Sequence, residues 1–184
     1  VWMPGASTHP LRQDCERRRF FFSGTPYGDF DQLPVEAAAA LWQEYRLIVN
    51  FGWNTLIAED EAKMRAFVTS GGVLATGLPQ WTTSARREIV EAPETMPLWH
   101  EGDLAESAGV RIRGIGAEFS GRWRWEIPGF AVTPELSGIP SRNPDEDGSC
   151  RVAEIELAGA EVVCRDAASD APLIVRKRSG AGWV

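Results

Sequence analysis

The segment at residues 46–81 limits the possible folds more than any other part of the chain. A short apolar run at 47–49 precedes a stretch with helical spacing, and a second apolar run at 73–76 follows Gly71-Gly72 directly. Glycine adopts the backbone conformation that ends a helix without steric cost. The order strand, helix, strand with these short connections predicts two parallel neighbouring strands joined by a right-handed crossover.

The helix expected near residues 58–70 is amphipathic. Its acidic residues Glu59, Asp60 and Glu61 fall in the first turn, where carboxylates complement the positive end of the helix dipole. Its apolar face is expected to contain Ile57, Met64, Phe67 and Val68.

Candidate ligand-binding residues follow from the same pattern. In open parallel sheets, ligands gather at the carboxyl ends of the strands. Tryptophan combines a flat apolar face with a polar edge, which suits contact with a sugar ring. Side-chain amides and hydroxyls can form hydrogen bonds with the hydroxyl groups of the sugar. The candidates at the two strand ends are Asn50, Trp53, Asn54, Gln80, Trp81 and Thr82.

The order strand, double glycine, strand and sharp turn resembles the class I glutamine amidotransferase-like fold. In that fold the turn carries a nucleophilic cysteine, and a histidine comes from far downstream. Here Leu78 and Pro79 occupy the turn, and the only histidines are His9 and His100. A cysteine nucleophile needs a base within hydrogen-bond reach. The resemblance therefore implies the scaffold without the chemistry, and no catalytic residue is assigned.

Short glycine-based motifs at 159–164, 171–176 and 179–184 resemble the end of amidotransferase-like domains in carbohydrate-active enzymes. The segment 101–112 is similar to another part of those domains. Examples are the trimerisation domain of bacterial β-galactosidases and the related domain of galacto-N-biose phosphorylases. In those enzymes a separate barrel carries the sugar chemistry. The resemblance implies a non-catalytic accessory or oligomerisation domain, with a fused or partner catalytic domain, a sugar ligand and a homo-oligomer as partners.

The expected architecture is a flavodoxin-like α/β fold, in which helices flank a mostly parallel sheet and a β-ribbon is inserted near 110–127. The whole chain, 1–184, is interpreted as one domain and as a possible piece of a longer protein. Helices are expected at 34–44, at 85–91 after Ser84, and at 103–108. Strands are expected at 19–23, 151–157, 161–164 and 173–177, and a polar loop at 138–149.

Composition excludes several kinds of partner. The net charge of −7 disfavours nucleic acid and anionic membranes, and no apolar run is long enough for a membrane-spanning helix. The three cysteines, Cys15, Cys150 and Cys164, form neither a CxxC pair nor a zinc pattern, so no metal and no cofactor are expected. The absence of a visible secretory signal favours the cytoplasm without determining the compartment.

Two other functions remain open. A carboxylate-dependent hydrolase needs paired acids, and the candidates are Asp29, Asp31, Glu101 and Asp103. A stand-alone module that binds a small sugar would use the tryptophans, of which the chain has eight. The same excess predicts self-association or a partner surface near Trp123, Trp125 and Trp183.

Overall fold

The computed structural model describes residues 24–25, 28–29, 33–50, 56–83, 97–127 and 151–184. The chain divides into two compact units, residues 1–37 and 38–184. In the first unit, β1 (Gly24–Thr25) and β2 (Gly28–Asp29) form an antiparallel pair. The elements expected at 19–23, 85–91 and 138–149 lie outside the described residues.

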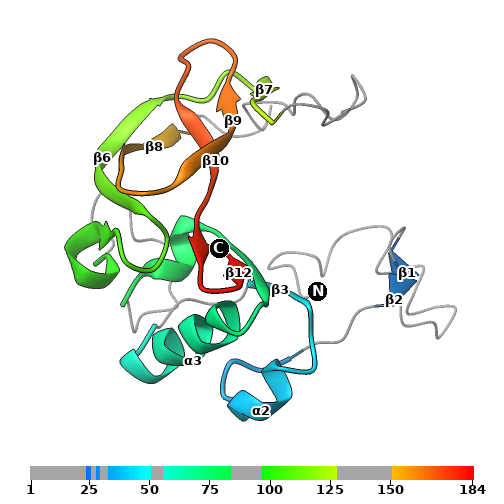
Figure 1. Ribbon diagram of the computed structural model, residues 1–184. Coiled ribbons are helices and arrows are strands. Elements are labelled where there is room, and N and C mark those ends of the chain that lie inside the picture. Colours follow the sequence, from blue (N-terminus) through cyan, green and yellow to red (C-terminus); the bar gives the residue numbers. More distant parts are fainter. Residues whose placement is uncertain (1–23, 26–27, 30–32, 51–55, 84–96, 128–150) are drawn as a thin grey trace, which may run out of the picture. The chain divides into compact units, whose positions relative to one another are not determined.

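The second unit contains the expected strand–helix–strand crossover (Figure 1). β3 (Leu47–Asn50) and β4 (Val73–Thr76) are parallel neighbours, and α3 (Ala58–Thr69) lies between them in the chain. The sheet has the order β11-β12-β4-β3. β12 (Gly182–Trp183) is parallel to β4, whereas β11 (Arg178–Ser179) is antiparallel to β12. The prediction that the two strands are parallel neighbours is confirmed.

The double glycine ends α3 in a Schellman motif. The N–H of Gly72 donates to the carbonyl of Phe67, and the N–H of Gly71 donates to that of Val68, each at 3.0 Å. Gly71 has a φ of 118°, which favours glycine. A Cβ on Gly72 would lie 2.3 Å from the ring of Phe67. Both glycines are therefore required for the tight link between α3 and β4.

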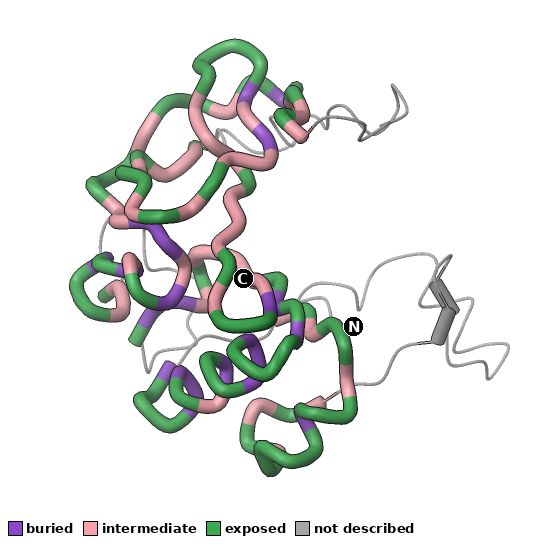
Figure 2. The backbone as a smooth tube through the Cα atoms, in the orientation of Figure 1, coloured by how far each residue is buried: buried purple, intermediate pink, exposed green. Residues whose placement is uncertain are grey.

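The core of the second unit gathers along one side of α3 (Figure 2). Met64, Phe67 and Val68 are almost completely buried. Trp42 of α2 (Ala39–Trp42) meets Phe67 edge-on, with ring centroids 6.0 Å apart. The contact places α2 against α3.

The first turn of α3 differs from the sequence expectation. Ile57 is 48% exposed, because it precedes the helix as the N-cap residue. Asp60 and Glu61 are buried instead. The acidic residues of this turn are therefore partly packed inside the unit and do not all face solvent.

One face of the parallel sheet is apolar and open. Leu47 and Val49 are 54% and 47% exposed, and Val73, which pairs with Leu47, is 38% exposed. Leu74, which points to the other face, is 2% exposed. Parallel sheets usually have both faces covered, so this face differs from the expected arrangement of helices on both sides.

An antiparallel sheet of order β5-β6-β8 follows in the chain. Its strands are β5 (Asp103–Leu104), β6 (Val110–Glu118) and β8 (Arg151–Leu157). The prediction of a helix at 103–108 is wrong, because the first two of these residues pair with β6 and only a single turn follows them.

A second antiparallel sheet has the order β10-β9-β7. Its strands are β7 (Trp123–Trp125), β9 (Glu161–Asp166) and β10 (Pro172–Arg176). The prediction of a β-ribbon at 110–127 is wrong, because the two strands in this range do not pair with each other. Instead β6 pairs with β5 and β8, and β7 pairs with β9. The three strands expected between 151 and 177 are confirmed, with small differences in their ends.

The helix expected at 34–44 is shorter in the structure. Ala38 has extended backbone, with a ψ of 140°, so α2 contains only four residues. The described chain is thus a mixed α/β structure with few helices and more strand than helix. Among its described residues, no helix is long and apolar enough to cross a membrane.

Candidate functional site

The sharp turn after β4 is a short 3-10 helix, η2 (Leu78–Trp81). The side chain of Gln80 reaches back, and its Oε1 accepts the N–H of Gly77 at 3.2 Å. Pro79 has no N–H to offer an oxyanion. The turn therefore provides neither a thiol nor a full set of amide donors.

Four of the six strand-end candidates lie in the described part of the chain. Asn50 ends β3 opposite Thr76 of β4. Trp81 is only 4% exposed. Thr82 is completely buried, its hydroxyl donates to the carbonyl of Pro79 at 3.1 Å, and its own carbonyl accepts the N–H of Leu56.

Trp53 and Asn54 lie outside the described residues. The ring of Trp81 and the hydroxyl of Thr82 are buried in internal contacts, so Asn50 and Gln80 are the more accessible of the four described candidates. A ligand-binding role for these residues stays a prediction.

In the described part of the chain, an acid and base role for the expected carboxylates stays a prediction. Asp31 lies outside it, and Asp29 is described only as part of β2. Asp103 accepts the backbone N–H of Ala105 at 3.1 Å and pairs with Arg111 at 3.3 Å. The Ala105 hydrogen bond is the main factor that holds the pKa of Asp103 below its usual value, and Arg111 adds to it. The carboxylate of Asp103 is therefore kept ionised and is held by Ala105 and Arg111.

A cluster of polar side chains that sequence reasoning missed lies at the start of α3. Glu61 is 8% exposed, and its Oε1 accepts the hydroxyl of Ser107 at 2.5 Å. Its Oε2 faces Nε2 of His100 at 3.6 Å. His100 and Glu101 lie in η4 (Trp99–Gly102) and both have positive φ, 49° and 55°. Such backbone is costly for residues other than glycine.

Burial disfavours the charged form of Glu61. The hydrogen bond from Ser107 and further interactions with Trp99, His100 and Arg65 outweigh that effect, so the pKa of Glu61 lies below its usual value. The order of contacts is hydroxyl, carboxylate, imidazole. A nucleophilic triad needs the imidazole between the other two groups, so this cluster is not arranged as a hydrolytic triad.

A surface depression of about 330 Å³ lies beside the cluster. Its lining residues are Glu61, His100, Asp103, Ala105, Glu106 and Ser107. Nζ of Lys177 donates to the carbonyls of Ala105 and Glu106, and Arg65 of α3 pairs with the carboxylate of Glu106. Contacts from α3 and from Lys177, which directly follows β10, therefore hold the turn that carries Ser107.

The sequence offered weak signals for this cluster. A glutamate in the first turn of a helix is explained by the dipole alone, and Ser107 lies in a stretch that resembles a helix. The two residues are 46 positions apart. Only the tertiary structure brings them together.

Comparisons with known proteins show that the fold of this chain is similar to parts of solved structures. No model of a protein family matches the chain, and no curated protein sequence matches it. A β-galactosidase from Bacillus circulans sp. alkalophilus is similar in structure, with a TM-score of 0.51 and 16% identity over 81% of this chain and 20% of that one.

Two further solved structures give lower scores. The exo-β-1,4-mannosidase Op5Man5 from Opitutaceae bacterium strain TAV5 has a TM-score of 0.47 and 20% identity, over 77% of this chain and 20% of that one. A β-galactosidase from Rahnella sp. R3 has a TM-score of 0.46 and 17% identity, over 77% and 19%. The chain spans about a fifth of the length of these structures.

Proposed function

We propose that this chain is a non-catalytic accessory or oligomerisation domain of, or derived from, a carbohydrate-active enzyme. The observation that carries the proposal is the likeness of fold to the Bacillus circulans β-galactosidase, which covers 81% of this chain but 20% of that one. The expected scaffold is amidotransferase-like and lacks the nucleophile. A fused or partner catalytic domain would then carry the sugar chemistry.

The open face of the parallel sheet supports a role in assembly. Leu47, Val49 and Val73 form a continuous apolar surface, since Leu47 pairs with Val73 and Val49 lies two residues further along β3. The helices α2 and α3 contact each other through Trp42 and Phe67. Apolar patches that remain exposed usually mark interfaces, so a second copy or a partner domain is expected to cover this face.

Sedimentation velocity at micromolar concentration tests the assembly role. The unchanged chain is expected to self-associate, and Val49→Glu is expected to yield a monomer, because a buried unpaired carboxylate is strongly unfavourable in an interface. Ile174→Glu is the matched control: Ile174 is similarly exposed, at 46%, but lies on β10 of another sheet. A monomer at every concentration, or equal loss of assembly in both variants, would contradict oligomerisation through this face.

The hydrolase alternative has its own test. The purified chain is expected not to hydrolyse aryl β-galactosides or aryl β-mannosides, because the carboxylates of Glu61, Asp103 and Glu106 are already held by hydrogen bonds or ion pairs, whereas glycoside hydrolysis needs a free pair of acid and base. Turnover that Asp103→Asn or Glu61→Gln abolishes would favour the carboxylate-dependent hydrolase instead.

A further inference from the structure

The open face of the parallel sheet is apolar at one side and basic at the other. Leu47 pairs with Val73, Val73 pairs with Trp183, and Trp183 pairs with Arg178. Paired residues of neighbouring strands point to the same face of a sheet, so these four side chains form one row across β3, β4, β12 and β11. Arg178 is exposed. The face that is apolar over β3 and β4 therefore ends in a positive charge at β11.

Trp183 gathers two arginines at this end of the row. The guanidinium carbons of Arg176 and Arg178 lie 4.8 and 5.9 Å from the centroid of its ring, within the range of cation–π attraction. Arg176 also pairs with Glu161 at 3.1 Å. No carboxylate of the described residues pairs with Arg178. Its charge is thus available to a carboxylate from outside the chain.

The face itself offers no such carboxylate. Its residues are Leu47, Val49, Val73, Ala75, Trp183 and Arg178. Two copies packed through this face would cover the apolar residues but leave Arg178 without a counter-ion, and removing an unpaired charge from water is costly. A partner that carries acidic groups is therefore a better complement to this face than a second copy of it.

The apolar part of the face has the width of one helix. Neighbouring strands lie about 4.8 Å apart, so β3, β4 and β12 together span about 10 Å, which matches the diameter of a helix with its side chains. Helices are also the usual cover of parallel strands. Neither α2 nor α3 can serve from a second copy, because α2 has four residues and the apolar side of α3 is buried in its own core.

We propose that an amphipathic α-helix of a partner domain covers this face, with its apolar side on Leu47, Val49 and Val73. Glutamate or aspartate along one flank of that helix pairs with Arg178 and Arg176. The inference rests on the accessory role proposed above and specifies the chemistry of the partner. Self-association of the isolated chain is then the behaviour of a face whose partner helix is missing.

Fluorescence anisotropy with two synthetic helical peptides tests the proposal. Both peptides carry leucine at i, i+3, i+4 and i+7, and the flank of one carries glutamates where the other carries lysines. The glutamate peptide is expected to bind the unchanged chain more than about tenfold more tightly, and its affinity is expected to fall as salt is added. Equal binding of both peptides would overturn the role of the arginines, and binding of neither would reject the helix.

Variants locate the acidic flank. Arg178→Glu is expected to weaken binding of the glutamate peptide more than about tenfold and to strengthen binding of the lysine peptide. Arg122→Glu is the matched control, since Arg122 is an exposed arginine in the turn before β7. The same change in both variants would contradict the assignment. The comparison of the two peptides on the unchanged chain remains decisive if Arg178→Glu does not fold.

Vesicles of phosphatidylglycerol test whether a lipid surface covers the face instead. The chain is expected not to bind them, because its net charge of −7 opposes an anionic surface. Binding that Arg178→Glu abolishes would overturn the partner helix in favour of a membrane surface. Sedimentation of the chain alone needs no acidic partner, so the assembly role and the acidic helix can fail separately.

Discussion

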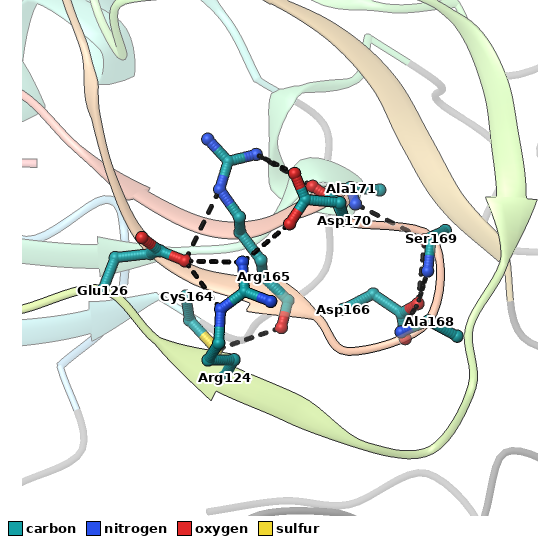
Figure 3. A network of polar contacts seen from close by, with 9 residues as sticks. All are labelled: Arg124, Glu126, Cys164, Arg165, Asp166, Ala168, Ser169, Asp170 and Ala171. Atoms are coloured by element: carbon teal, nitrogen blue, oxygen red, sulfur yellow. Dashed lines mark hydrogen bonds and ion pairs between the residues drawn. The ribbon is translucent and has the colours of Figure 1, made fainter.

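At the scale of single residues, Asp166 holds one end of the β10-β9-β7 sheet together. It is completely buried. Its Oδ1 accepts the N–H and hydroxyl of Ser120 at 2.9 and 2.6 Å, and its Oδ2 accepts the N–H and hydroxyl of Ser169 at 2.7 and 2.8 Å (Figure 3 shows the Ser169 side). Burial alone would raise the pKa of Asp166, but these hydrogen bonds hold it far below the usual value.

We expect Asp166→Asn to lower the free energy of unfolding by about 3 kcal/mol at neutral pH, because hydrogen bonds to a charged group are lost inside the protein. Because the folded-state pKa of Asp166 is depressed, its contribution to stability is fully present above the unfolded pKa of about 4 and is lost progressively as the pH falls from there through the lower folded-state pKa. Urea unfolding across pH checks both points. The difference in free energy of unfolding between the unchanged chain and Asp166→Asn should become smaller at acidic pH.

Asp170→Asn is the matched control for this experiment. Asp170 pairs with Arg124 at 2.7 Å, but its side chain is 67% exposed. Exposed pairs contribute less than about 1 kcal/mol. An equal loss of stability in both variants would show that burial of Asp166 is not the cause.

At the scale of elements, glycines allow β12 to lie directly against the end of α3. A Cβ on Gly182 would lie 2.1 Å from the carbonyl oxygen of Gly72 and 2.2 Å from that of Val68. The neighbouring N–H of Trp183 donates to the carbonyl of Gly72 at 3.1 Å. The backbone of β12 therefore occupies the place that a side chain would need.

Gly182→Ala is expected to lower the thermal midpoint and to cost about 3 kcal/mol, since the clash is with backbone that cannot move without breaking β12 from β4. Gly114→Ala on β6 should change stability by less than about 1 kcal/mol, because the nearest atom to its new Cβ is 4.0 Å away, at the end of a glutamate. Thermal unfolding of both variants decides this. A small effect at Gly182 would mean that β12 does not contact α3 in solution.

At the scale of the whole molecule, the scaffold is expected to lack glutaminase activity. Leu78 and Pro79 occupy the turn after β4, and Cys164, the one cysteine in the described part, is 1% exposed. Burial raises the pKa of the Cys164 thiol, so little thiolate forms at neutral pH. The purified chain should release no ammonia from glutamine. Turnover that Cys164→Ala removes would overturn this expectation.

The sequence alone determined the strand–helix–strand crossover and the strands between 151 and 177. Their signals are local: apolar runs, helical spacing, carboxylates in the first turn and a double glycine at the helix end lie within a few residues of the structure that they specify. The same reasoning overestimated the helices at 34–44 and 103–108, because helix propensity is weak where the backbone of Ala38 is extended or a neighbouring strand pairs with Asp103.

Only the tertiary structure decided which strands pair and which polar groups meet. β6 pairs with β8 and β7 with β9, and the partners come from a distant part of the chain, so the local pattern that predicts a strand contains no information about its neighbour. Glu61 and Ser107 are brought together in the same way. The burial of Glu61 and the open face of Leu47 and Val49 also depend on packing, because a residue is buried by what lies against it, and that is set by the whole fold.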